Sequence, residues 1–247
     1  MSSRVAIVTG AGRGLGSAIA SGLAAEGVSV VLAGRTPDHL TMVEKEILDH
    51  GGTALSVPTD VTDPDSVRRL FQTSVDRFSR LDVLVNNAGV TGQTKLADLD
   101  DAEWHRIFDT NVNGMFLCTR AAGELFADAG RGRAINVASV FGLLGRPGFT
   151  AYCASKGAVI NFTRAAAAEW ARFGSQINAV APGYFATDIN AELRADIAAT
   201  DKVLRRIPAH RMGDPAELAN LVTYLALQAP DFLTGQTIAI DGGESSI

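Results

Sequence analysis

Short runs of apolar residues recur at regular distances along the chain, and more polar segments of helical length separate them. The runs are rich in β-branched residues and are apolar at consecutive positions, which is typical of parallel strands that helices cover on both faces. Seven such runs occur, at residues 5–10, 28–34, 53–58, 81–89, 133–139, 176–183 and 236–243. The pattern therefore predicts an alternation of buried strands and amphipathic helices.

The ends of the helical segments carry capping signals. The segment SAIASGLAAEG ends in Gly27, which we expect to act as a C-cap. The segment DPDSVRRLFQTSVDRF opens with Asp63 before Pro64, and we expect Asp63 to act as the N-cap of that helix. With right-handed crossovers, the alternation predicts an α/β fold: a single-domain, Rossmann-like, doubly wound parallel sheet of about seven strands, with helices on both faces, over residues 1–247. Ligands of such sheets bind beyond the carboxyl ends of the strands.

Composition and charge narrow the class of protein. The 247 residues are 47% hydrophobic and 20% charged, as in globular proteins. No apolar run approaches the roughly 20 residues of a membrane span, and the N-terminal segment lacks the features of a signal peptide, so we expect a cytoplasmic protein. The net charge of −5 disfavours a nucleic-acid partner. The two cysteines and four histidines lack disulfide or metal-ligand spacing, so no metal site is predicted.

A glycine-rich segment, TGAGRGLG, follows the first apolar run. Glycine at positions Gly10, Gly12, Gly14 and Gly16 lets backbone amides approach a phosphate, and the N-terminus of the following helix favours negative charge. The spacing departs from GxGxxG, and a tight turn alone would explain the glycines. Their position directly after the first strand favours a dinucleotide site.

The end of the second apolar run indicates which dinucleotide is bound. Arg35 stands where NAD-binding proteins carry an acidic residue for the ribose hydroxyls. Arg35 and Arg13 can instead pair with a 2′-phosphate through charge-assisted hydrogen bonds. Asp38, the nearest acid, follows Pro37 and is expected to cap the next helix. We therefore predict a preference for NADP(H), with NAD(H) as the alternative.

Three further elements belong to the same edge of the predicted sheet. Asp60 follows the third run and either accepts a hydrogen bond from an adenine amino group or forms a turn. Residues 86–89, NNAG, are small and rich in amides, so that a flat ring or a ribose can pass close to the backbone. A type I′ turn would explain the same residues, but no matching hairpin strand follows. Ser139 ends the fifth run and brings a hydroxyl to this edge.

The segment TAYCASKGAV begins the next predicted helix and holds Tyr152 and Lys156 four residues apart, where their side chains meet. A structural explanation is a tyrosine packed on the core beside a lysine that reaches solvent. The alternative is chemical. With Thr150 as the expected N-cap, Tyr152 lies in the first turn, where the helix dipole stabilises a phenolate.

Proton transfer by this tyrosine requires a lower phenol pKa. Lowering it by three units from about 10 requires roughly 4 kcal/mol of preferential phenolate stabilisation. Lys156, the helix dipole and a bound nicotinamide cation can together supply this. Ser139 would then hold the substrate oxygen while Tyr152 transfers a proton and the nicotinamide carries hydride. The predicted chemistry is carbonyl reduction or its reversal.

Taken in order, these motifs resemble those of short-chain dehydrogenases/reductases. The resemblance runs from Val5 to Gly243 and rests on TGAGRGLG, Asp60, NNAG, Asn111 in NVNG, Ser139, YCASK and PGYFAT. It implies a catalytic tetrad of Asn111, Ser139, Tyr152 and Lys156, in which the asparagine holds a water molecule of a proton relay. It also implies homotetramers, which are typical of the family.

The motifs and the resemblance together assign a set of residues to the cofactor. These residues are Gly10, Arg13, Gly14, Leu15, Gly16, Arg35, Asp60, Val61, Asn87, Ala88, Gly89, Tyr152, Lys156, Pro182, Gly183 and Thr187. Two subgroups of the family look close: gluconate 5-dehydrogenases with related sugar-acid oxidoreductases, and 3-oxoacyl-carrier-protein reductases. We favour a small polar keto or hydroxy substrate such as a sugar acid.

Residues 184–212 are expected to form a lid over the substrate. The lid holds four cations that either attract a carboxylate or phosphopantetheine or form a solvated helix face: Arg194, Lys202, Arg205 and Arg206. Residues 152–173 carry too much apolar surface for one sheet-facing stripe, so a second subunit is expected to cover the remainder. A dinucleotide-binding regulator without turnover is the rival class, but it would not need tyrosine, lysine and serine together.

Overall fold

All seven predicted strands form, and they pair in parallel in a single sheet of order β3-β2-β1-β4-β5-β6-β7. The computed structural model describes residues 4–187 and 195–246. The strands are β1 (Val5–Thr9), β2 (Ser29–Gly34), β3 (Thr53–Pro58), β4 (Val83–Asn86), β5 (Gly132–Val137), β6 (Ser175–Pro182) and β7 (Thr237–Ile240). The predicted fold class is confirmed.

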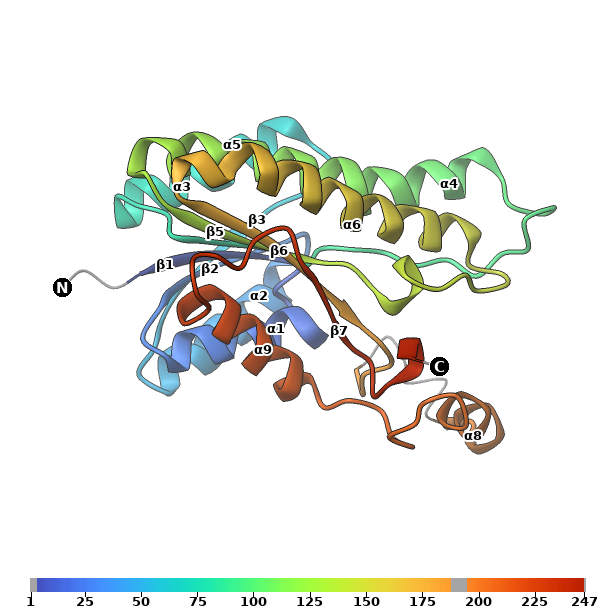
Figure 1. Cartoon of the computed structure of the whole chain (residues 1–247). Coiled ribbons are helices and arrows are strands. Elements are labelled where there is room, and N and C mark those ends of the chain that lie inside the picture. Colours follow the sequence, from blue (N-terminus) through green and yellow to red (C-terminus); the bar gives the residue numbers. More distant parts are fainter. Residues whose placement is uncertain (1–3, 188–194, 247) are drawn as a thin grey trace.

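Helices cover both faces of the sheet, as Figure 1 shows. One layer consists of α1 (Gly14–Ala25), α2 (Pro37–Asp49) and α9 (Pro215–Leu227). The opposite layer contains α3 (Pro64–Phe78), α5 (Met115–Ala129) and α6 (Thr150–Trp170). The helix α4 (Asp101–Phe108) continues into α5 through a single π-helical segment, η1 (Asp109–Gly114), while α8 (Ile197–Leu204) lies beyond the carboxyl ends of the strands.

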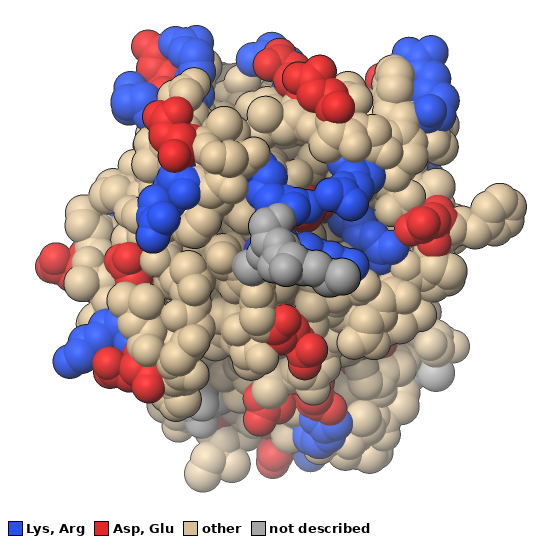
Figure 2. Space-filling view, turned by 90° about the vertical axis from the view of Figure 1, so that its left-hand side faces the viewer, with Lys and Arg blue, Asp and Glu red and all other residues tan. Residues whose placement is uncertain are grey.

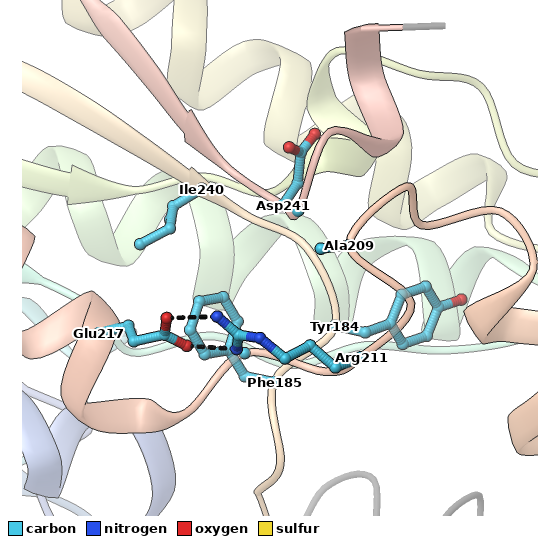
Figure 3. A pocket seen from close by; sticks show the side chains of 9 residues that line it. Tyr184, Phe185, Ala209, Arg211, Glu217, Ile240 and Asp241 are labelled. Atoms are coloured by element: carbon cyan, nitrogen blue, oxygen red, sulfur yellow. Dashed lines mark hydrogen bonds and ion pairs between the residues drawn. The ribbon is translucent and has the colours of Figure 1, made fainter.

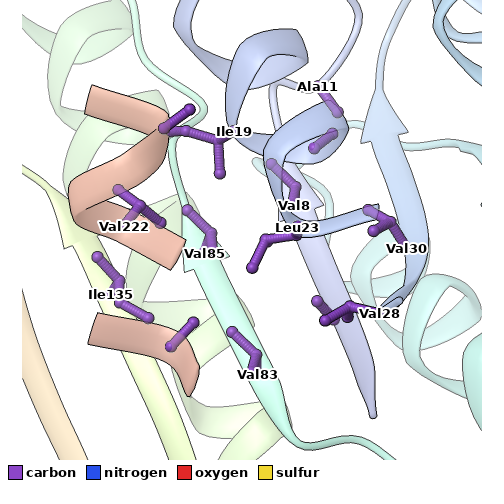
Figure 4. Packing of buried hydrophobic residues seen from close by; sticks show 14 of the residues in the cluster. Val8, Ala11, Ile19, Leu23, Val28, Val30, Val83, Val85, Ile135 and Val222 are labelled. Carbon is purple, nitrogen blue, oxygen red and sulfur yellow. The ribbon is translucent and has the colours of Figure 1, made fainter. Parts of the chain in front are cut away.

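The two layers of helices explain why the strands are apolar at consecutive positions. Val8 packs toward α1 and α9 against Ile19, Leu23 and Val222 (Figure 4). Its neighbour Ile7 belongs to the cluster on the other face, under α3 and α5. Because successive side chains of a strand point to opposite faces, a sheet covered on both sides needs apolar residues at every position.

The capping residues that the sequence predicts are confirmed at the start of α3 and wrong at the end of α1 and the start of α2. Asp63 caps α3 as predicted, and its carboxylate accepts a hydrogen bond from the backbone N–H of Asp65. The C-cap of α1 is Glu26, so the prediction of Gly27 was wrong by one residue; Gly27 follows with φ +77° and closes the helix in the left-handed conformation. Asp38 does not cap α2, because it already lies inside the first turn, after the N-cap Thr36.

The interior of one chain covers one face of α6. Val159, Ile160 and Ala166 are buried, and Trp170 packs edge-on against a phenylalanine of α5. The premise that α6 is too apolar for its own chain was therefore wrong for these residues, because α5 lies beside α6 and adds a second apolar neighbour. Phe173, just beyond α6, remains 38% exposed.

The two ends of the sheet differ in character. The strand order reverses between β1 and β4, so the carboxyl ends of these strands border the crevice in which doubly wound sheets bind ligands. At the opposite end, Figure 2 shows Lys and Arg side chains gathered on one face. Arg133 at that end donates hydrogen bonds to the carbonyls of Leu225 and Ala229, at the C-terminal end of α9, and pairs with Asp231. Its cation has a structural role there.

Across residues 4–187 and 195–246, none of the helices has both the length and the apolar character that crossing a membrane requires.

Candidate active site

The carboxyl ends of β1 and β4 are joined by Thr9 and Asn87. The Thr9 hydroxyl accepts hydrogen bonds from the backbone N–H groups of Asn87 and Ala88, each at 3.0 Å, and donates to the carbonyl of Val85. The side-chain amide of Asn87 donates to the carbonyls of Thr9 (2.9 Å) and Gly10 (3.2 Å). Asn87 thus holds the glycine turn in place. Sequence reasoning missed the role of Thr9, because nothing in the spacing reveals which groups a buried hydroxyl will bind.

The glycine turn itself tolerates no side chain at two positions. A Cβ on Gly16 would lie 2.1 Å from the carbonyl oxygen of Gly10, and Gly10 adopts φ +66°. Gly14, with φ +59°, starts α1, and Leu15 follows it in the first turn. The backbone N–H groups of a first helical turn lack intrahelical partners and favour an anion. The cradle therefore fits the pyrophosphate of a dinucleotide.

Asn86 does not face this edge. Its side-chain amide donates to Thr119 Oγ1 and Asn136 Oδ1 in the interior, and Asn136 in turn donates to Thr163. The predicted amide-rich surface at the end of β4 therefore does not include Asn86. Successive side chains of a strand point to opposite faces, so Asn86 and Asn87 do not share one surface.

The predicted adenine side of the site holds exposed arginines and one carboxylate. Arg13, at the N-cap of α1, and Arg35, after β2, are both exposed. Asp60 Oδ1 accepts hydrogen bonds from the backbone N–H and the hydroxyl of Thr62, and these bonds, together with the charge of Arg35, lower the pKa of Asp60 against the effect of burial. Asp60 thus forms the turn that was its structural alternative, and a contact with adenine stays a prediction. The next residue, Val61, is buried.

Tyr152 and Lys156 meet as the sequence predicts. Lys156 Nζ lies 5.7 Å from the centre of the Tyr152 ring and donates a hydrogen bond to the carbonyl of Val137 at 2.7 Å. The predicted N-cap was wrong: Phe149 occupies that position, without a side-chain capping hydrogen bond, and Thr150 is the first helical residue. Tyr152 still lies within the first turn of α6.

Burial governs the protonation of both groups. Lys156 is only 4% exposed, and burial lowers its pKa to about 8. Burial raises the pKa of Tyr152, and a hydrogen bond with Ser139 opposes this rise. The direction is opposite to the predicted lowering, because the loss of phenolate solvation exceeds what the surrounding side chains return. Ser139 and Tyr152 are nevertheless within hydrogen-bonding contact.

Asn111 lies in the π-helical segment η1, and such segments are frequent at functional sites. Its side chain exchanges two hydrogen bonds with the backbone of Val90, at 2.8 and 2.9 Å, and donates to Ser155 Oγ at 3.0 Å. Ser155 donates in turn to the carbonyl of Tyr152. These bonds tie η1 to the first turn of α6, and the proton-relay role of Asn111 stays a prediction.

Gly89 lies between two members of the predicted tetrad. A Cβ there would be 3.3 Å from Asn111 Oδ1 and 3.5 Å from Lys156 Nζ. The structure therefore gathers Asn111, Ser139, Tyr152 and Lys156 around the carboxyl ends of β4 and β5.

The end of β6 approaches the glycine turn from the other side. Pro182 ends the strand, and Gly183 packs closely against Asp241, which follows β7. Thr187 is buried, and a Cβ on Gly14 would make ordinary contact with it, at 3.7 Å. Of the four predicted lid cations, Lys202 and Arg205 are exposed, Arg206 is half-buried, and Arg194 lies outside the described residues.

A cavity of about 190 Å³ is lined by residues that follow β6 and by the end of β7 (Figure 3). Arg211 and Glu217 line it and form a bidentate ion pair, with both distances 2.7 Å. Hydrogen bonds from Arg211 and from the backbone of Asp214 lower the pKa of Glu217 to about 2. Because Glu217 also completes the capping box of α9, this pair is structural. The residues that line this cavity do not include Tyr152.

Comparison with known proteins identifies the family. A family model described as short chain dehydrogenase matches residues 4–198. A 3-oxoacyl-(acyl-carrier-protein) reductase of Synechocystis sp. is 42% identical over 245 residues, which cover 98% of this chain and 97% of that protein. The chain belongs to the short chain dehydrogenase family. This membership confirms the resemblance seen in the sequence and the assignment to oxidoreductases.

Two further members of the short chain dehydrogenase family are similar to this chain. A gluconate 5-dehydrogenase of Gluconobacter oxydans is 39% identical over 238 residues, covering 96% of this chain and 93% of that protein. The crystal structure of a gluconate 5-dehydrogenase from Burkholderia cenocepacia in complex with NADP and tartrate superposes with a TM-score of 0.95, at 36% identity, and covers 100% of this chain and 97% of that one.

The buried lysine should lower the stability of the protein at neutral pH. Its pKa is about 8 in the folded chain and 10.5 in an unfolded one, so between these values the unfolded chain binds more protons and stability rises with pH. We expect Lys156→Met to raise the free energy of unfolding at pH 7 by about 1–3 kcal/mol, a range that already subtracts the cost of losing the hydrogen bond to Val137. At pH 10 the same substitution should raise the free energy of unfolding by less, because the wild-type lysine is then largely neutral in the folded chain.

Urea denaturation of both proteins at pH 7 and pH 10 measures this difference. Lys45→Met, at an exposed position of α2, is the matched control and should show no such dependence on pH. If Lys156→Met changed the free energy of unfolding equally at the two pH values, the lowered pKa of Lys156 would be contradicted.

Proposed function

We propose that the protein is an NADP(H)-dependent oxidoreductase. It transfers hydride between nicotinamide and a carbonyl or secondary alcohol of a small polar keto or hydroxy substrate, such as a sugar acid. One observation carries the proposal: Tyr152, Lys156 and Ser139 converge at the edge of the sheet where the glycine cradle opens.

In this proposal each residue has a separate task. Ser139 holds the substrate oxygen and orients the Tyr152 hydroxyl, with which it forms a hydrogen bond. Tyr152 donates its proton to that oxygen during reduction and removes it during oxidation. Lys156, protonated below about pH 8, offsets the charge of the phenolate. The nicotinamide supplies the hydride chemistry when it is bound.

The Tyr152 hydroxyl is the group that the reaction cannot spare. We expect Tyr152→Phe to reduce kcat at least about 100-fold, because the proton donor is lost while the ring remains. Tyr224→Phe, on the exposed surface of α9, is the matched control and should retain activity. Absorbance follows NADPH oxidation with keto-sugar acids, oxoacyl thioesters and simple ketones, and NADP+ reduction with sugar acids and polyols.

The same substrate panel separates the rival functions. Activity on acetoacetyl thioesters with none on keto-sugar acids would identify an acyl reductase, the function named for the Synechocystis relative. A wild-type chain that binds NADPH but turns over no member of the panel would favour a regulator. Full activity of Tyr152→Phe would refute the mechanism.

The preference for NADP(H) rests on charge at the adenine side. Arg13 and Arg35 are both exposed there, and Arg35 lies close enough to Asp60 to affect its pKa. The relative from Burkholderia cenocepacia is in complex with NADP. A 2′-phosphate between two guanidinium groups would form charge-assisted hydrogen bonds, each worth about 1.5–3 kcal/mol.

Removal of one of these cations should therefore lower the preference. We expect Arg35→Ala to raise the KM for NADPH about 10-fold or more and to leave the KM for NADH nearly unchanged. Arg164→Ala removes an exposed arginine of α6 as the control. A wild-type enzyme with a higher kcat/KM for NADH than for NADPH would overturn the assignment.

We also propose a cytoplasmic homotetramer in which residues 184–212 cover the substrate. Two large aromatic side chains support an interface on the α5 and α6 side, since Phe116 is 40% and Phe173 is 38% exposed. Light scattering at micromolar concentration should give four times the 25.9 kDa of one chain. A monomer at that concentration would contradict the assembly.

A further inference from the structure

Three polar side chains from distant parts of the sequence lie together beyond the ends of β6 and β7. Arg146 lies in the loop before α6, Tyr184 follows β6, and Glu244 lies in the last short helix, η5 (Glu244–Ser246). They meet because β6 and β7 are neighbouring strands and end together, with Pro182 beside Ile240. Arg146 hydrogen-bonds to the Tyr184 hydroxyl, and Arg146 and Glu244 both act electrostatically on Tyr184. We call Arg146, Tyr184 and Glu244 the distal cluster.

A single aromatic ring separates the distal cluster from the proposed proton donor. The guanidinium carbon of Arg146 lies 5.8 Å from the centre of the Phe141 ring. That ring packs edge-on against both Tyr184 and Tyr152, with centroid distances of 6.0 and 6.3 Å. In Figure 3 the Tyr184 ring points away from the Arg211–Glu217 pair. Arg146 and Tyr152 thus both lie against the buried ring of Phe141.

The distal cluster has hydrogen-bonding capacity that the chain itself does not use. Glu244 is 7% exposed, and its Oε2 has no hydrogen-bond partner among the described residues. A buried acceptor without a partner costs free energy, which a ligand hydroxyl would recover. Arg146 carries five N–H donors in a planar fork, more than the Tyr184 hydroxyl can accept.

We propose that Arg146 binds the carboxylate of the substrate and that Glu244 accepts a hydrogen bond from one of its hydroxyls, so that the site selects polyhydroxy acids. This inference rests on the proposed function and specifies its substrate. Arg146 is half-buried, whereas Lys202 and Arg205 of the predicted lid are exposed, and an ion pair is stronger where water is partly excluded. An acyl thioester presents neither the carboxylate nor the hydroxyls that the distal cluster would bind.

Binding to the NADPH-saturated enzyme tests the inference without turnover, because D-gluconate and NADPH are both reduced. Calorimetric titration compares D-gluconate with D-gluconamide, which keeps the hydroxyls and lacks the charge. We expect Arg146→Gln to weaken gluconate binding about 10- to 100-fold and gluconamide binding less than about 3-fold. Arg172→Gln is the matched control, since Arg172 stacks on Phe173 as Arg146 stacks on Phe141, and it should change neither affinity.

A second variant tests the hydroxyl contact. Glu244→Leu should weaken gluconate and gluconamide binding alike, by about 10-fold, because both ligands carry the hydroxyls. Replacing Glu244, whose Oε2 has no hydrogen-bond partner among the described residues, should not unfold the chain. Two measurements, the thermal melting temperature and the affinity for NADPH, verify that each variant remains folded.

Two kinds of result would overturn the inference. The first is an Arg146→Gln enzyme whose affinity for gluconate is unchanged, or which loses as much affinity for gluconamide as for gluconate. Likewise, a Glu244→Leu enzyme with unchanged affinity for both ligands would refute the contact between Glu244 and a substrate hydroxyl. The other is a wild-type holoenzyme that does not bind gluconate at all. If such an enzyme still reduced other ketones with NADPH, the oxidoreductase proposal would stand while the polyhydroxy acid assignment failed.

Discussion

The hydrogen bond from Lys156 to the carbonyl of Val137 joins the first turns of α6 to the end of β5, and the geometry of the active site depends on it. An amine in the protein interior is costly, as its pKa of about 8 indicates, and Val137 supplies a fixed acceptor that compensates in part. With α6 held there, Tyr152 reaches Ser139, which lies two residues beyond the end of β5. Ser155 and Asn111 hold the same turn of α6 from its other side.

The cofactor side of the site depends on a different bond system. Thr9 and Asn87 join the ends of β1 and β4 across the point where the strand order reverses. Gly16 then lets α1 start so close to Gly10 that no side chain fits between them. Both systems use backbone carbonyls and amides at strand ends, where the sheet no longer pairs them. The fold thereby provides the polar partners from which the site is built.

The substrate side is less constrained by the sheet. Arg146, Tyr184 and Glu244 come from a loop, a strand extension and the C-terminal segment, and only the packing around Phe141 and the pairing of β6 with β7 bring them together. Loops of this kind can change without disturbing the paired strands. Relatives named as gluconate 5-dehydrogenase and as acyl-carrier-protein reductase are each similar to almost the full length of this chain.

The sequence by itself determined the seven strands, the alternation with helices, and the proximity of Tyr152 to Lys156, because strand burial and helical spacing are local properties of the chain. Tertiary structure decided the rest. Whether Asn86 faces the edge or the interior, whether Thr150 or Phe149 caps α6, and whether burial raises or lowers a pKa all depend on neighbours from other elements. The distal cluster is the extreme case: its members are separated by up to about a hundred residues, and no local pattern records a contact that only the folded sheet creates.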